Sequence, residues 1–170
     1  TETNEQMRGI NRNLGLPRQN ISPGNTSYQV GQDYIYGYDC SGFVNWCLLN
    51  ADTKYNINSS LVVKDLSALG NRISITDPEA INRVQEGDFA IIEDSHIGIV
   101  VNVDKTNSEI TVVHESESGG GMNLTTQSTE TGLITKDEIG ATNDINQGNN
   151  EIFSREGQQY FQEIVLMNYE

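Results

Sequence analysis

Two cysteines and two histidines are the residues of this 170-residue chain that are able to build a thiol nucleophile and its base. Cys40 lies in "YDCSGFVNWC", where a stretch rich in turn residues becomes apolar. The first turn of a helix presents unpaired N–H groups and a partial positive charge, which lower the pKa of a thiol. The small residues Ser41 and Gly42 leave the Cys40 sulfur approachable. The sequence therefore predicts that Cys40 is a nucleophile.

The second cysteine has an ordinary structural explanation. From Cys40 onward the apolar residues recur with the spacing of an amphipathic helix, and Asp39 is a suitable N-cap. Cys47 lies two turns further along the same stripe, so we expect it to face the core. Seven residues of helix rise by roughly 10 Å, which is too far for a disulfide. We therefore expect both thiols to be reduced.

The two histidines are expected to share one hairpin. His96 begins a strand-like segment and His114 ends the next one. If the connection has an odd number of residues, such as Asp104–Ser108, His114 lies opposite Gly98 and both rings lie on one face. An even loop without a bulge places them on opposite faces. On one face, His96 accepts the Cys40 proton and His114 orients the His96 ring.

The charge composition excludes some classes of binding partner. The formal net charge is −14 and no cluster of more than two Lys or Arg residues occurs, so nucleic acid and anionic membranes are disfavoured. The mean hydropathy is −0.49, but periodic apolar segments argue for a folded chain. No apolar run approaches the roughly 20 residues of a membrane span. The chain begins with Thr1 rather than Met, which is typical of a processed chain or an excised domain and leaves room for other domains before it.

The order of periodic segments predicts helices first and an antiparallel sheet afterwards, which is an α+β domain. Residues 1–27 read as an N-terminal arm and residues 28–170 as one globular domain. Helices are expected from Cys40, over 60–69, and after Asp77-Pro78. Strands are expected over 87–92, 96–103 and 108–116, with a further hairpin over 149–169. Residues 119–150 are rich in Gly, Asn, Thr and Ser and are expected to form a long surface loop.

Four blocks of the sequence, in order, resemble the signature of the NlpC-type cysteine endopeptidases of bacterial cell walls. They are "YDCSGFVNW", "EGDFAII", "SHIGIVV" and "VVHES", and the resemblance covers about residues 28–116. It assigns the nucleophile to Cys40, the base to His96 and the orienting residue to His114. It implies an α+β papain-like NlpC fold, with N-terminal helices packed on a central antiparallel sheet of about five to six strands.

The resemblance also implies a substrate pocket. Tyr28 precedes the nucleophile by a dozen residues, as a family tyrosine does, and its hydroxyl would share an oxyanion hole with the Cys40 backbone N–H. Asp39 and Ser41 match positions that line the pocket for the free amino end of the peptide stem. Gln32 stands where the family has a second glycine, and the chain beyond Gly119 matches no block of the family.

The implied reaction is hydrolysis of a peptidoglycan stem-peptide amide, typically between γ-D-glutamate and a diamino acid, through a thioester on Cys40. It implies an extracellular or cell-wall-associated enzyme that needs no cofactor and no metal. The spare amine of the diamino acid suits an acidic protein.

Three alternatives stay open at the level of sequence. The CHAP amidases and endopeptidases share the Cys-then-His order, but they usually have an acidic residue or Asn in place of His114. A zinc site from Cys40, His96, His114 and Asp39 uses acceptable ligands but lacks a closely spaced pair. An inactive wall-binding module is compatible with the long polar segment but leaves the three candidate catalytic residues unexplained.

Overall fold

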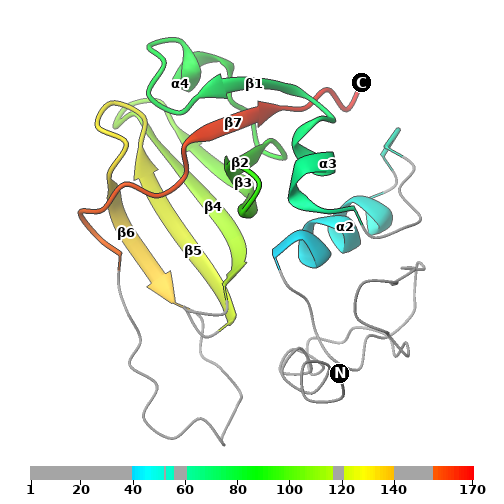
Figure 1. The fold of residues 1–170 in the computed structure, drawn as a ribbon. Helices are drawn as coiled ribbons and strands as arrows, with labels where there is room; N and C mark the ends of the chain where they lie inside the picture. The colour runs from blue at the N-terminus through cyan, green and yellow to red at the C-terminus, as the bar shows by residue number, and fades with distance from the viewer. Residues whose placement is uncertain (1–39, 52, 56–60, 117–120, 140–154) are drawn as a thin grey trace, which may run out of the picture.

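The computed structural model describes residues 40–51, 53–55, 61–116, 121–139 and 155–170. The arm expected over residues 1–27 lies outside them. Within them, one antiparallel sheet of seven strands dominates the fold, in the order β1-β7-β2-β3-β4-β5-β6 (Figure 1). The strands are β1 (Asn71–Ser74), β2 (Phe89–Ile92), β3 (His96–Asp104), β4 (Glu109–Ser116), β5 (Gly121–Ser128), β6 (Ile134–Ile139) and β7 (Glu163–Leu166).

Three short helices accompany the sheet in the described part of the chain. They are α2 (Cys40–Asn50), α3 (Val63–Ser67) and α4 (Ala80–Arg83). Figure 1 shows α2 and α3 together on one side of the sheet, while α4 lies near β1. Among the described residues, none of the helices has both the length and the apolar character that a membrane crossing requires.

The two faces of the sheet build two separate cores. On the face that we call the helix face, Phe89, Ile91, Ile97 and Val165 pack against apolar residues of α2 and α3. On the opposite face, which we call the histidine face, the core includes Ala90, Val100, Val112, Ile164 and Phe161. Alternation along each strand separates the two sets, because successive side chains point to opposite sides of a sheet.

Residues 155–162 lead into β7 and cover part of the histidine face, where Tyr160 and Phe161 pack on the core. Leu133 forms an isolated bridge with Gln159, beside the start of β6. The fully buried Gln127 side chain donates to the carbonyl oxygens of Gly132 and Phe161, each at 2.8 Å, and accepts the Phe161 N–H. These three hydrogen bonds satisfy a buried amide and fix the position of Phe161 over the sheet.

The prediction of an α+β papain-like NlpC fold, with helices packed on five or six strands, is wrong. The described residues form a seven-stranded sheet, and only α2 exceeds five residues. The helix expected over 60–69 shortens to α3, and the one after Asp77-Pro78 shortens to α4. The antiparallel direction of the strands is confirmed.

The second half of the chain explains most of this difference. The segment expected to be a loop over 119–150 contains β5 and β6. In place of the hairpin expected over 149–169, the described part has only β7, which pairs with β1 and β2. β1 was not expected at all. Because β5 and β6 add two paired strands beside β4, more of the described chain is strand, and less is helix, than the sequence predicts.

Candidate active site

The β3–β4 hairpin brings the two histidines to one face, but by a different route from the expected one. At its tip Asp104 pairs with Glu109, so the loop has an even number of residues rather than an odd one. A β-bulge between Val100 and Asn102 then shifts the pairing by one residue. Beyond the bulge, Val100 pairs with Val112, and the register brings Gly98 beside His114. The bulge therefore restores the alignment that the even loop would have removed.

The tip of the hairpin is held by a single carboxylate. Asp104 Oδ1 accepts the backbone N–H groups of Thr106 and Asn107 at 3.0 and 3.1 Å, and Oδ2 accepts the Asn107 amide at 2.8 Å. An aspartate that caps its own turn in this way fixes the length of the loop. The four-residue connection is thus a property of the local sequence.

His96 and His114 are in direct contact. His96 Nε2 lies 2.7 Å from His114 Nδ1, and the two rings meet edge to face with centroids 4.8 Å apart. Phe161 stacks on His96 at 5.7 Å, and Tyr160 lies against both rings. Gly98 is required here, because a Cβ on this residue would lie only 2.8 Å from the Cβ of His114. The aromatic side chains and the glycine together fix both imidazoles.

Burial keeps both imidazoles neutral at pH 7. His114 is 0% exposed, and burial, the neighbouring His96 and the Arg155 guanidinium lower its pKa to about 3. Burial and Arg155 lower the pKa of the partly exposed His96 to about 4. An imidazole must shed hydration to enter this core, and the neutral ring loses less than the cation. A resting imidazolium at His96 is therefore not favoured by this environment.

Two side chains that the sequence did not single out continue the contact beyond His114. His114 Nε2 lies 2.7 Å from Thr125 Oγ1, and the Thr125 hydroxyl donates to Asp137 Oδ1 at 2.8 Å. The other oxygen of Asp137 accepts the Arg155 backbone N–H at 3.0 Å. Thr125 and Asp137 were missed because they lie on β5 and β6, inside the segment expected to be a loop. A period-two pattern in "MNLTTQS" was the available signal, but its buried positions are polar.

Cys40 is the first residue of α2, as the sequence predicts. Its Sγ lies 4.0 Å from the carbonyl oxygen of Ser95, the residue immediately before His96. The Cys40 side chain packs at the edge of the core on the helix face, whereas the histidines point to the other face. The thiol thus contacts the backbone immediately before β3, at the residue that precedes His96.

The remaining predicted pocket residues are only partly described. Ser41 is partly buried on α2, and its carbonyl oxygen accepts the Asn45 side-chain amide at 2.7 Å. Asn45 also binds both backbone groups of Leu61, so it ties the beginning of α2 to the chain that leads into α3. Tyr28 and Asp39, including the expected N-cap, lie outside the described residues.

Cys47 was expected to face the core, and the structure leaves it partly buried inside α2. Both cysteines are free thiols, and Cys47 lies inside α2, where burial raises its pKa to about 12. A thiol with such a pKa holds almost no thiolate at pH 7 and is a poor nucleophile. Of the two cysteines, Cys40 is the one whose thiol contacts the residue before His96.

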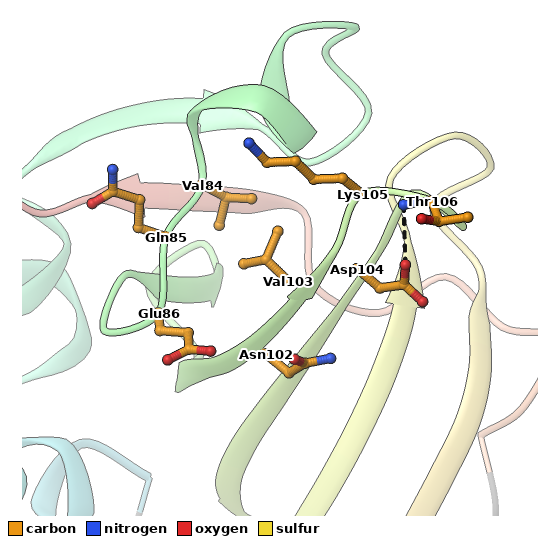
Figure 2. A pocket seen from close by; sticks show the side chains of 8 residues that line it. All are labelled: Val84, Gln85, Glu86, Asn102, Val103, Asp104, Lys105 and Thr106. Atoms are coloured by element: carbon orange, nitrogen blue, oxygen red, sulfur yellow. Dashed lines mark hydrogen bonds between the residues drawn. The ribbon is translucent and has the colours of Figure 1, made fainter.

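An open hollow of about 720 Å³ lies at the other end of β3 (Figure 2). Its lining comes from residues 84–86 and 102–106. Along β3, the first lining residue of this hollow, Asn102, lies six positions from His96, a distance of roughly 20 Å at about 3.3 Å per residue. The Asp104 carboxylate in its wall is already used by the turn. The hollow and the candidate catalytic histidines therefore lie at opposite ends of β3.

A metal site at the histidine pair is disfavoured by the hydrogen bonds of His114. Both of its ring nitrogens lie 2.7 Å from protein partners, so neither presents a lone pair to an ion. Across the described ranges, no three side chains of the His, Cys, Asp and Glu types are grouped to hold a metal.

Comparisons of the chain with protein-family models, with curated proteins and with solved structures found no match.

Proposed function

We propose that this chain is a cysteine hydrolase that cleaves a stem-peptide amide of peptidoglycan, with Cys40 as nucleophile, His96 as base and His114 as the residue that orients His96. The observation that carries the proposal is the 2.7 Å contact between His96 and His114, together with a helix-start thiol whose Sγ lies 4.0 Å from the carbonyl oxygen of Ser95, the residue before His96. The proposal rests on the motifs and on this geometry, and it does not need the papain-like fold.

The neutral state of His96 sets the form of the chemistry. Because its pKa is about 4, His96 acts as a general base that takes the Cys40 proton as the sulfur attacks. The new S–C bond gives a tetrahedral oxyanion, for which the Cys40 backbone N–H at the helix start is a suitable donor. When the C–N bond breaks, His96 returns its proton to the leaving amine. Water then adds to the thioester with His96 as base, and the acid and the thiol are released.

The substrate class comes from the resemblance to the NlpC-type blocks. It suggests the bond between γ-D-glutamate and a diamino acid, with Tyr28 in the oxyanion hole and Asp39 and Ser41 around the free amine. A net charge of −14 favours a substrate with a spare amino group. Peptidoglycan as substrate makes an extracellular or wall-associated location part of the same proposal.

The rival activity is that of a CHAP-type N-acetylmuramoyl-L-alanine amidase. Such enzymes usually orient the base with an acidic residue or Asn, and Glu115 is the acidic neighbour here. His114 makes the contact with His96, while Glu115 is directed to the opposite face of β4 by strand alternation. This arrangement favours the endopeptidase over the amidase.

Mass spectrometry of purified muropeptides, digested by the native protein and by Cys40→Ala side by side, tests the proposal. We expect new amino ends on the diamino acid with the native protein and none with Cys40→Ala. Cys47→Ala is the matched control and is expected to keep its activity, because the Cys47 thiol lies two turns along α2 from Cys40 and its pKa is raised to about 12. Stems released whole from the sugar would establish the amidase instead. Wall fragments bound equally by the native protein and Cys40→Ala, and never cleaved, would establish an inactive binding module.

A further inference from the structure

We propose that Thr125 and Asp137 are positioning residues that hold His96 in the tautomer with its proton on Nε2, so that Nδ1 carries the free lone pair. Four side chains, one from each of the adjacent strands β3, β4, β5 and β6, form a continuous line of hydrogen bonds: His96, His114, Thr125 and Asp137. The inference deepens the proposed function and rests on it only for its catalytic consequence.

The direction of each hydrogen bond follows from the end of the line. An ionised carboxylate only accepts, so the Thr125 hydroxyl must donate its one proton to Asp137. Thr125 Oγ1 then has only lone pairs left for His114, and His114 must carry its proton on Nε2. Because His114 is neutral, its Nδ1 is an acceptor, and the proton between the two rings belongs to His96 Nε2. Nδ1 of His96 is therefore unprotonated and able to take a proton.

Burial prevents these hydrogen bonds from reversing their direction. Thr125 is 1% exposed and His114 is 0% exposed, so a proton pointing the wrong way has no nearby solvent to satisfy it. Asp137 is held in place by the Arg155 backbone N–H, which needs an acceptor at Oδ2. Reversal of the line requires a donor in place of Asp137 Oδ1.

Asp137→Asn supplies such a donor with almost no change of shape. The Arg155 N–H retains the amide oxygen, so the amide nitrogen faces Thr125 and donates to it. Thr125 then donates to His114 Nε2, His114 carries its proton on Nδ1, and that proton points to His96 Nε2. His96 is left with its proton on Nδ1, where the base must be free.

The chain contains only two histidines, which makes the tautomers directly measurable. We would label the histidines of the full chain with ¹⁵N and assign the protonated ring nitrogens by NMR at pH 7. In the native protein both rings are expected to carry the proton on Nε2, and in Asp137→Asn both are expected to carry it on Nδ1. Glu138→Gln, on the neighbouring exposed residue, is the control and keeps the native pattern.

Thr125 offers a second, independent variant. Thr125→Val removes the hydroxyl with little change of volume and breaks the line, whereas Thr125→Ser keeps the hydroxyl and is expected to rescue the native tautomers. Thr126→Val is the matched control, because the Thr126 hydroxyl bonds Thr111 on the other face of β5. If Asp137→Asn and Thr125→Val both leave the two protons on Nε2, the inference is overturned.

The activity readout separates this inference from the proposed function. We expect Asp137→Asn to lower kcat about 10²-fold or more with little change in KM, because a triad histidine in the wrong tautomer loses up to about 10⁴-fold. Reversed tautomers in a protein whose native form never cleaves muropeptides would support the hydrogen-bond inference and refute the enzyme. Cleavage of muropeptides by the native protein, with the protons still on Nε2 in Asp137→Asn, would support the enzyme and refute the hydrogen-bond inference.

Discussion

Replacing His114 by Gln tests the claim that the buried imidazole is neutral. The pKa of His114 is about 3 in the fold and about 6.5 in an unfolded chain. The folded pKa is the lower one, so between these values the unfolded chain binds a proton that the folded chain does not. Stability from this group is complete above pH 6.5 and is lost as the pH falls toward 3.

The size of the effect follows from the same two pKa values. Between pH 7 and pH 5, the free energy of unfolding is expected to fall by about 2 kcal/mol on account of His114 alone. Gln keeps a polar side chain at this position and does not titrate. Whatever His114→Gln costs at pH 7, its stability should therefore fall by about 2 kcal/mol less than that of the native protein over this interval.

Urea unfolding, followed by the fluorescence of Trp46, the single tryptophan, measures both proteins at each pH. The acidic residues contribute to both chains alike, so the difference between the two pH dependences isolates His114. His114→Asn serves in the same comparison if the Gln variant does not fold. Parallel loss of stability in the native protein and the variant, or a His114 NMR titration near pH 6.5, would refute the reasoning.

Three further predictions concern the same region. Gly98→Ala places a Cβ 2.5 Å from a Val112 methyl and is expected to cost about 1–3 kcal/mol in urea unfolding, and an unchanged midpoint would contradict the packing. Iodoacetamide should modify Cys40 well before Cys47, whose pKa burial raises to about 12, and peptide mapping that finds equal rates would disprove the distinction. Because His96 must be neutral to accept a proton, kcat/KM should stay level from pH 7 to pH 5 and halve near pH 4, whereas an acid limb near pH 6.5 would contradict the low pKa.

The elements predicted correctly are those with a clean apolar period. The stripe from Cys40 gave α2, and the segments around His96 and His114 gave β3 and β4. The contact between the histidines was also predicted, although the loop parity was not. The sequence shows the Asp104 turn residues, but a bulge at Val101 leaves no local signature in a run of alternating valines and isoleucines. The loop is one residue shorter than expected and the bulge adds one residue to the strand, so the two differences cancel and His96 and His114 still share a face.

The strands that were missed have polar residues at their buried positions. In β5 the buried side chains include Asn123, Thr125 and Gln127, which read as loop residues in the sequence. They are tolerated because partners on other segments satisfy two of them: Asp137 and His114 for Thr125, and the backbone at Gly132 and Phe161 for Gln127. Such partners become visible only once the strands are paired, so hydrophobic periodicity could not find β5.

The position of Cys40 relative to His96, on which the proposed proton transfer depends, is set by the short turn that begins β3. The Cys40 side chain packs on the helix face and the two rings lie on the other face, so the proposed proton transfer requires the thiol to approach His96 where β3 starts. That start is fixed by Ile92 pairing with His96 and by the Ser95 N–H donating to the Ile92 carbonyl oxygen. Asp94 takes the left-handed conformation in this turn, with φ of 56°, which Asp tolerates and a β-branched residue does not. One residue more or less here would turn His96 to the helix face and separate it from His114, because the side chains of a strand alternate.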